Sequence, residues 1–178
     1  MRSVHQVRSV SFLDRPGVYS EEFDGADFAA AVHLICHYEK EDGQKVGVGT
    51  MRIRYLRERG YVAWERFAIR PKVPQKVFLS LVNYARDYCL RKGIHTVLGT
   101  VHDERLQRFW ASKGARFLNE PDRQTVDGRH WRMMLLPLAT SEDSDLAVDT
   151  SNSSGDLAPA YHDIMHEIDR DILGMREV

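Results

Sequence analysis

The chain alternates apolar and polar residues through its first half and later carries apolar residues at helical spacing. Alternation with a period of two is typical of strands that bury one face, whereas a period near 3.6 is typical of amphipathic helices. Asp42-Gly43 separates the first two alternating segments and favours a β-hairpin. We expect strands at residues 30–38, 46–56, 61–69, 96–101, 116–118 and 131–138.

The predicted helices have recognisable ends. Lys92 and Gly93 close one of them with a cation and a glycine, and Asp103 is a good N-cap for another. An antiparallel meander followed by alternating helices and strands predicts an α/β (α+β) fold with a mixed, mostly antiparallel central sheet flanked by helices. We expect helices at residues 5–13, 77–90, 104–112 and 161–178.

Composition divides the chain into three parts. We expect residues 1–138 to form one domain, residues 139–160 an acidic flexible linker, and residues 161–178 an amphipathic helix that docks, for example as a homodimer contact. Residues 139–178 carry ten Asp/Glu and two Arg, a net charge of −8, whereas residues 1–138 carry 23 Lys/Arg and 16 Asp/Glu, a net charge of +7. A basic domain attracts anionic ligands such as nucleotides, phosphopantetheine or acidic proteins.

Several functional classes are excluded by what the sequence lacks. No segment has the length and apolarity of a membrane span, and the first residues lack the apolar core of a secretory signal. Cys36 and Cys89 lie in apolar segments, which predicts buried reduced thiols, a cytoplasmic location and no metal site. Because no Arg/Lys run alternates with stacking aromatics, we expect neither nucleic acid nor a membrane as partner.

Gly47 and Gly49 interrupt the second predicted strand. A glycine inside a strand commonly marks a bulge or a place where another backbone or side chain comes close. We expect one of these two features there.

Residues 65–79 predict a strand, a Pro-bounded loop and the first turn of a helix. A helix N-terminus presents unpaired N–H groups and about half a positive charge, which suits a phosphate-bearing ligand. Lys72 and Lys76 would add cationic donors beside it. The alternative is that Pro71 and Pro74 merely end a strand and start a helix.

The order of these segments resembles the GNAT acetyltransferase superfamily over roughly residues 20–138. Residues 65–71 (Glu-Arg-Phe-Ala-Ile-Arg-Pro) resemble its central strand, and residues 109–115 (Phe-Trp-Ala-Ser-Lys-Gly-Ala) resemble its late helix-to-strand element. The runs 22–24 (Glu-Phe-Asp) and 32–34 (Val-His-Leu) also resemble many members. The resemblance implies acetyl-CoA as co-substrate and a small-molecule amine as acceptor.

The resemblance also implies where the donor binds. Its pantetheine arm would pair with the backbone of the third strand, and its pyrophosphate would sit on amides of the following turn. The cofactor-binding residues implied in this way are Phe67, Ala68, Ile69, Lys72, Gln75, Lys76, Val77, Phe78, Asp103 and Trp110.

The turn departs from the family pattern. Three small residues, glycines at the first two positions, are replaced by Gln75, Val77 and Leu79. Gln75 and Lys76 could compensate through side-chain contacts. Without glycines a phosphate has less access to the backbone, and we expect Val77 and Leu79 to make the mouth of the site bulkier.

The expected proton donor is also missing. Many members carry a Tyr that protonates the departing thiolate, and Trp110 stands at that position here. An indole donates hydrogen bonds but cannot act as a general acid. Tyr84 and His102 are substitutes that the sequence cannot place, and Asp103 stands at the position of a family Asn.

Glu65 is the best catalytic candidate, since a carboxylate there could take a proton from an incoming amine directly or through water. Because side chains alternate along a strand, we expect it to share a face with Phe67 and Ile69. The alternative is a structural ion pair with Arg52 or Arg54 of the neighbouring strand.

Arginines alternate along the second strand and into the turn after it, at positions 52, 54, 57 and 59. We expect them to form a solvated strand face. The alternative is that they line the acceptor site and select an acidic substrate.

Three functions remain open. The first is an N-acetyltransferase in which a primary amine attacks acetyl-CoA directly. The second takes its acyl group from an acyl carrier protein, as in the acyl-homoserine-lactone and N-acyl amino acid synthases, whose turns also lack glycines. The third is a catalytically silent GNAT-like ligand-binding module, which Trp110 and the missing glycines favour.

Overall fold

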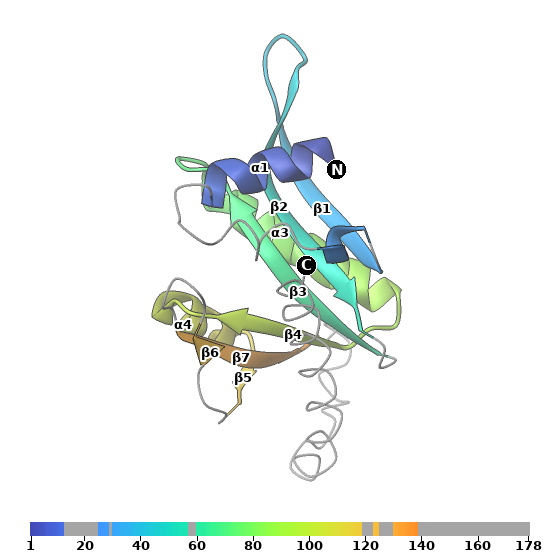
Figure 1. Ribbon diagram of the computed structural model, residues 1–178, viewed down its shortest axis with the longest axis vertical. Helices are drawn as coiled ribbons and strands as arrows, with labels where there is room; N and C mark the ends of the chain where they lie inside the picture. The colour runs from blue at the N-terminus through green and yellow to red at the C-terminus, as the bar shows by residue number, and fades with distance from the viewer. Residues whose placement is uncertain (13–24, 29, 57–59, 119–122, 125–129, 139–178) are drawn as a thin grey trace.

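A computed structural model of the chain describes residues 1–12, 25–28, 30–56, 60–118, 123–124 and 130–138 (Figure 1). The helices are α1 (Arg2–Phe12), the short 3-10 helix η1 (Gly25–Asp27), α3 (Lys76–Arg91) and α4 (Glu104–Ser112). The strands are β1 (Ala31–Glu39), β2 (Lys45–Tyr55), β3 (Tyr61–Ile69), β4 (Thr96–Val101), β5 (Arg116–Phe117), β6 (Arg123–Gln124) and β7 (His130–Pro137). The predicted linker and C-terminal helix, residues 139–178, lie outside the described residues.

The strands pair in the order β1-β2-β3-β4-β7-β5, and β6 pairs with β7. Every described pair of strands is antiparallel except β3 with β4. Parallel neighbours need a long crossover connection, and α3 forms it here. α1 lies against β2 and β3 on one face of the sheet, and α3 lies against β1 and β2 on the other (Figure 1). The predicted mixed, mostly antiparallel sheet flanked by helices is confirmed.

Two glycines in β2 let helices approach the sheet from both sides. The register between β1 and β2 shifts at these glycines, which leaves Val48 as an extra residue of β2. The bulge turns Gly47 and Gly49 to opposite faces. A Cβ on Gly47 would meet Val7 Cγ2 of α1 at 3.1 Å, and a Cβ on Gly49 would meet Val77 Cγ1 of α3 at 2.9 Å. The bulge and the close approach that we gave as alternatives are both present.

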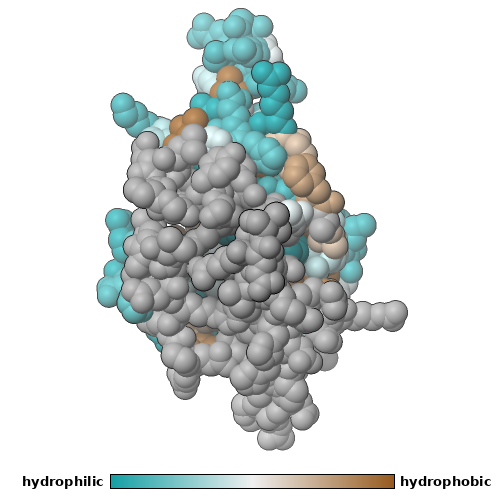
Figure 2. Space-filling view, viewed as in Figure 1, coloured by the Kyte–Doolittle hydropathy of each residue, from teal (hydrophilic) through white to brown (hydrophobic). Residues whose placement is uncertain are grey.

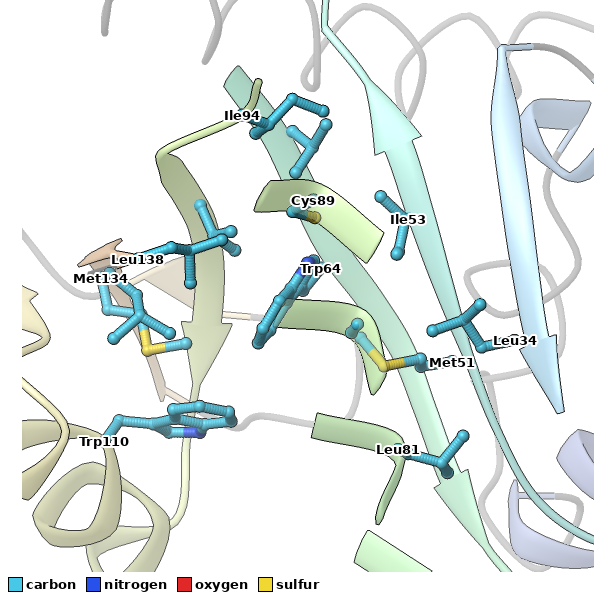
Figure 3. Packing of buried hydrophobic residues seen from close by; sticks show 14 of the residues in the cluster. Leu34, Met51, Ile53, Trp64, Leu81, Cys89, Ile94, Trp110, Met134 and Leu138 are labelled. Atoms are coloured by element: carbon cyan, nitrogen blue, oxygen red, sulfur yellow. The ribbon is translucent and has the colours of Figure 1, made fainter. Parts of the chain in front are cut away.

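The larger core lies between the sheet and α3 (Figure 3). The helix contributes one stripe of buried residues spaced by four: Val77, Leu81, Ala85 and Cys89. The buried strand residues of this core are Leu34, Met51, Ile53, Val62, Trp64, Val97, Val101, Met134 and Leu136. Burying a side chain of this size contributes about 1.5–3 kcal/mol, so this core holds α3 firmly on the sheet.

Both cysteines are free thiols. Cys89 is fully buried, as predicted, whereas Cys36 on the edge strand β1 is only half-buried, so the prediction of burial is wrong for Cys36. Burial raises the pKa of the Cys89 thiol and outweighs the neighbouring indole of Trp64, which acts in the opposite direction.

The predicted turns form at their glycines. Gly43 in the β1–β2 hairpin and Gly93 after α3 have φ angles of +79° and +70°, which favour glycine. Gln44 N donates to Asp42 Oδ1 at 2.9 Å and tightens the hairpin. Residues 37–45 are exposed, and the hairpin end projects from the sheet as a hydrophilic tip (Figure 2).

Candidate functional site

β3 and β4 pair only near their beginnings. The described pairs run from Tyr61↔Thr96 to Ala63↔Leu98. Both strands continue beyond the last pair, and there they separate (Figure 1). Within the described residues, the edge of β3 that faces β4 therefore has no strand partner from residue 64 onward. Such an edge can accept an extended ligand as an added strand.

A bulge in β3 lies on this same stretch. The register between β2 and β3 passes from Arg52↔Glu65 to Thr50↔Ala68, so β3 holds one residue more than β2 there. Arg66, within the bulge, has φ +50°, a left-handed conformation that costs a non-glycine residue roughly 1–2 kcal/mol. Bulges bend a strand and redirect its side chains, and they are common beside active sites.

The bulge changes which side chains of β3 share a face. Glu65 contacts arginines of β2 on the α1 side of the sheet. Phe67 lies on the α3 side, where its ring centroid is 5.0 Å from that of Phe78, and Ile69 also packs against the core there. The prediction that Glu65 shares a face with Phe67 and Ile69 is therefore wrong, because simple alternation does not continue through a bulge.

The turn after β3 leaves the N-terminus of α3 open. Gln75 takes the N-cap position in a helical conformation, and its side chain caps no N–H group. Val77 N donates to Pro74 O, whereas no acceptor among the described residues is found for the N–H groups of Gln75, Lys76 and Phe78. These groups carry the positive end of the helix dipole, so the turn can hold an anion.

Val77 does not project into this turn, so the prediction that it makes the mouth bulkier is wrong. Its side chain is buried and points toward β2. A Cβ atom on Gly49 of β2 would lie only 2.9 Å from Val77 Cγ1. The neighbouring strand thus carries a glycine that leaves room for the valine. Leu79 is 40% exposed on α3, and Lys72 is exposed in the turn with φ +65°.

Five aromatic side chains of the described residues gather where β3 and β4 separate, and we call them the aromatic cluster. They are Trp64 and Phe67 of β3, Phe78 of α3, and Phe109 and Trp110 of α4. Ring centroids are 5.0 Å apart for Phe67–Phe78, 5.2 Å for Phe78–Phe109, 5.0 Å for Phe109–Trp110 and 6.1 Å for Trp64–Trp110. The two tryptophans are buried (Figure 3), and the three phenylalanines are partly exposed.

Trp110 thus stands at the position implied for a proton donor and belongs to the aromatic cluster. The two substitute acids have other surroundings. Tyr84 is 57% exposed on α3, with the Arg91 guanidinium 5.9 Å from its ring centroid. His102 packs against Trp131 of β7, with ring centroids 4.4 Å apart and ring planes tilted by 52°.

Asp103 caps α4, as predicted. Its Oδ1 accepts hydrogen bonds from Arg105 N at 2.8 Å and Leu106 N at 3.0 Å. The bond from Leu106, with that from Arg105, lowers the pKa of the Asp103 carboxyl. A contact between Asp103 and the acyl donor stays a prediction.

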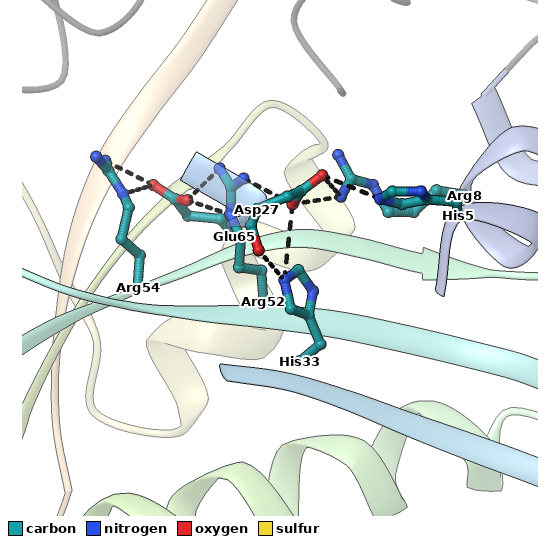
Figure 4. Close-up of polar contacts among 7 residues, drawn as sticks. All are labelled: His5, Arg8, Asp27, His33, Arg52, Arg54 and Glu65. Carbon is teal, nitrogen blue, oxygen red and sulfur yellow. Dashed lines mark hydrogen bonds and ion pairs between the residues drawn. The ribbon is translucent and has the colours of Figure 1, made fainter. Parts of the chain in front are cut away.

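A line of charged and imidazole side chains crosses the α1 face of the sheet (Figure 4). At its centre, Asp27 of η1 accepts hydrogen bonds from Arg8 of α1 at 2.8 Å and from Arg52 of β2 at 2.9 Å. His33 Nε2 lies 3.1 Å from the backbone oxygen of Asp27, and His5 Nε2 lies 3.4 Å from its Oδ2. We call the following residues the ion-pair network: His5, Arg8, Asp27, His33, Arg52, Arg54 and Glu65.

Because Asp27 is buried, this network has a structural role. The side chains of Arg8, Asp27 and Arg52 are only 1–2% exposed. Burial by itself raises the pKa of Asp27, but the hydrogen bond and charge of Arg8, together with those of Arg52, outweigh it and hold the pKa below its usual value. The ionised carboxylate therefore ties α1 and η1 to β2.

Glu65 is held by two arginines of the same network. Its Oε2 accepts from Arg52 Nε and Nη2 at 3.0 and 2.7 Å, and its Oε1 accepts from Arg54 Nε and Nη2 at 3.1 and 2.9 Å. A carboxylate has about four lone-pair sites, so these bonds occupy all of them. The ion pair that we gave as the alternative to catalysis is present with both arginines.

The expected solvated strand face is wrong for Arg52 and Arg54. They are 1% and 7% exposed, and the register of β2 places the guanidinium groups of both against Glu65. Positions 57 and 59 lie outside the described residues.

Sequence reasoning missed Arg8 and Asp27 as members of the network. They lie 19 positions apart, and Asp27 and Arg52 lie 25 apart, so no local period connects them. The one available signal was the family resemblance of residues 32–34, and it did not indicate which residue His33 contacts.

The described part of the chain contains neither a metal-binding group of side chains nor a membrane-spanning helix. No group of three His, Cys, Asp or Glu side chains there could hold a metal ion. No helix among the same residues is long and apolar enough to cross a membrane.

Known structures share this architecture. A candidate N-acetyltransferase from Lactobacillus plantarum aligns with a TM-score of 0.64 and 18% identity over 78% of this chain and 90% of that one. An acyl-CoA N-acyltransferase from Pseudomonas aeruginosa gives 0.59 and 20% over 76% and 88%. BjaI, a CoA-dependent acyl-homoserine lactone synthase with SAM and isopentyl-CoA, gives 0.52 and 18% over 70% and 65%.

These similarities concern the fold. No protein-family model matches the chain, and no curated protein matches it. The TM-scores of 0.64 and 0.59 show that the chain has the fold of the GNAT acetyltransferases, as its sequence predicted, and identities of 18% and 20% show nothing beyond the fold. One fold hosts many reactions, so the reaction has to be argued from the site.

Proposed function

We propose that this chain is an N-acyltransferase that moves an acetyl group from acetyl-CoA to a primary amine of a small molecule. One observation carries the proposal: an edge of β3 that has no strand partner among the described residues leads directly to an open helix N-terminus. An extended amide-containing arm that ends in a pyrophosphate matches this combination. The fold shared with an acyl-CoA N-acyltransferase supports it.

The donor would be held by backbone groups and cations. Its pantetheine amides would pair with the backbone of residues 67–69. Its phosphates would accept hydrogen bonds from the N–H groups of Gln75, Lys76 and Phe78, which have no acceptor among the described residues. Lys72 and Lys76, both exposed, would add charge.

The transfer is a direct substitution at the thioester carbonyl. The amine nitrogen forms the new C–N bond, the C–S bond breaks, and the sulfur leaves with the bonding electron pair as a thiolate. A thiol has a pKa near 8.5, so a thiolate is an acceptable leaving group at neutral pH although Trp110 cannot protonate it. Holding amine and thioester in line would supply most of the acceleration.

Glu65 is the proposed acceptor of the proton that the amine loses, directly or through a water molecule. Its four accepted hydrogen bonds oppose this role, because a proton has to displace one of them. We therefore assign Glu65 a modest share of the catalysis. Asp103 and Trp110 remain proposed contacts of the acyl donor, acetyl-CoA.

Calorimetric titration with CoA tests the proposal. We expect saturable binding that weakens as salt rises, since phosphate contacts are screened. Lys76→Glu should weaken binding, whereas Lys92→Glu, a matched change at the opposite end of α3, should not. If CoA does bind, thiol release from acetyl-CoA in the presence of small amines tests turnover. Absence of CoA binding at low salt would refute the proposal.

A carrier-protein donor is a second candidate, favoured by the exposed cations of α4. Arg105, Arg108 and Lys113 lie on this helix or at its end, next to the aromatic cluster. An acidic carrier protein would find complementary charge there. Tight binding of free CoA without any binding of a phosphopantetheine-loaded acyl carrier protein would exclude it.

A catalytically silent ligand-binding module is the third candidate. The saturated hydrogen bonding of Glu65 and the tryptophan at position 110 favour it. Acetyl transfer to any amine, at a rate that falls in Glu65→Gln, would exclude it. We further propose a cytoplasmic location, where Cys36 and Cys89 stay reduced, and a homodimer through residues 161–178, which lie outside the described residues.

A further inference from the structure

We propose that the aromatic cluster determines the length of the acyl group, and that Trp110 is the residue that limits it to a short chain. This inference rests on the proposed donor site. The cluster has a buried end, formed by Trp64 and Trp110, and a partly exposed end, formed by Phe67, Phe78 and Phe109. A ligand that runs along it meets phenyl rings first and indole rings last.

Two fixed points orient the donor along the cluster. Its phosphates would lie at the open N-terminus of α3, whose first turn carries Phe78. Its arm would follow the backbone edge of residues 67–69. The acyl end then lies farther back along β3, toward the last pair with β4 at Ala63↔Leu98.

Two indole rings meet at that point. Trp64 directly follows Ala63, and its ring packs edge-on against Trp110 with centroids 6.1 Å apart and planes at 62°. One ring comes from β3 and the other from the helix that follows β4, so their contact spans the strands where they separate. Figure 3 shows the ring of Trp64 beside the ribbon of β3 and the ring of Trp110 beyond the end of β4.

Close packing at this contact is what would select the acyl group. Trp110 is 6% exposed and also lies 5.0 Å from Phe109 and 6.1 Å from Phe78, measured between ring centroids. Packed interiors do not take up additional methylenes without displacing side chains. An acetyl group would end before the indoles, whereas a longer chain would have to push Trp110 aside.

The inference also accounts for the departure at position 110. An indole gives up the acid chemistry of a tyrosine, and in exchange it presents a larger rigid surface with contacts to three other members of the cluster. Trp110 is therefore a specificity-determining residue that does not exchange a proton.

Calorimetry with CoA, acetyl-CoA and hexanoyl-CoA tests this inference on the full chain. The wild type should bind acetyl-CoA at least about tenfold more tightly than hexanoyl-CoA, given that one methylene alone can change recognition by that factor. Trp110→Leu should reduce this ratio at least about tenfold, and Trp110→Phe should fall between. Tyr38→Leu, an aromatic-to-leucine change at an exposed hairpin position, should leave the ratio unchanged.

The outcomes separate this inference from the proposed function. The inference is overturned, and the donor site stands, if the wild type binds CoA but does not distinguish acetyl-CoA from hexanoyl-CoA. The same holds if both Trp110 variants keep the affinity ratio of the wild type. If the wild type binds neither CoA nor its thioesters, both are overturned. Circular dichroism establishes folding, and if Trp110→Leu does not fold, Trp110→Phe and Phe109→Leu carry the test.

Discussion

Replacing Asp27 by alanine should destabilise the protein strongly. Asp27 accepts hydrogen bonds of 2.8–2.9 Å from Arg8 and Arg52, and all three side chains are 1–2% exposed. Removing one partner of a buried ion pair costs about 3–5 kcal/mol, because the remaining charge stays in a poorly solvated place. We therefore expect the free energy of unfolding to fall by about 3–5 kcal/mol, a large share of the roughly 5–15 kcal/mol typical of a domain.

Urea denaturation at neutral pH measures this loss, and the chain offers a matched control. Asp87 pairs with Arg86 at 3.1 Å, but both side chains are 49% exposed. Exposed pairs contribute about 0–1 kcal/mol, so Asp87→Ala should change the unfolding free energy by no more than that. If Asp27→Ala loses no more stability than Asp87→Ala, the reasoning about the buried network is refuted.

The same carboxylate predicts a pH dependence with a definite sign. The pKa of Asp27 is lower in the folded protein than its ordinary value of 3.8. Its contribution to stability is therefore present above that value and is lost as the pH falls through the folded-state pKa. The stability difference between the wild type and Asp27→Asn should shrink toward acid pH. A difference that grows would contradict the sign.

Three further predictions concern other parts of the fold. Gly49→Ala should lower the unfolding free energy by about 1–3 kcal/mol through the 2.9 Å approach to Val77, and adding Val77→Ala should recover part of that loss in denaturation experiments; strictly additive losses would count against it. Burial, with the hydroxyl of Tyr88, raises the pKa of Tyr55 to about 12, so its contribution to stability is complete below pH 10 and disappears toward pH 12. Ultraviolet titration of Tyr55→Phe should lack the highest tyrosinate step, and an unchanged titration would disprove the assignment. Glu65→Gln should lower kcat by about 100-fold, the low end for a general base, and an unchanged kcat would remove Glu65 from the mechanism.

The sequence predicted the architecture because the features that determine it are local. Alternating residues marked the strands of the meander, and the apolar stripe of α3 repeats at helical spacing. Asp42-Gly43, Gly93 and Asp103 marked turns and a helix start through their own backbone and side-chain chemistry. The bulge in β2 was among the alternatives for the same reason, since Gly47 and Gly49 carry a local signal.

The site was predicted less completely because its decisive features are not local. Nothing near Arg66 marks a bulge, and this one residue moves Glu65 to the opposite face from Phe67. The room for Val77 comes from Gly49 on another strand, which no count along the turn reveals. Arg8 and Asp27 meet only through the packing of α1 and η1 on β2, so a run of arginines looked solvated although two of them are buried.

The central claim is that a CoA-type donor lies along the backbone of residues 67–69 in β3 and on the N-terminus of α3. Two-dimensional amide NMR during a titration with CoA tests it most directly. We expect saturable shifts of the amide signals of residues 67–69, Gln75, Lys76 and Phe78, with no shifts in the hairpin at residues 40–45. Saturable binding that leaves the α3 and β3 amides unchanged, or no binding at all, would contradict the account.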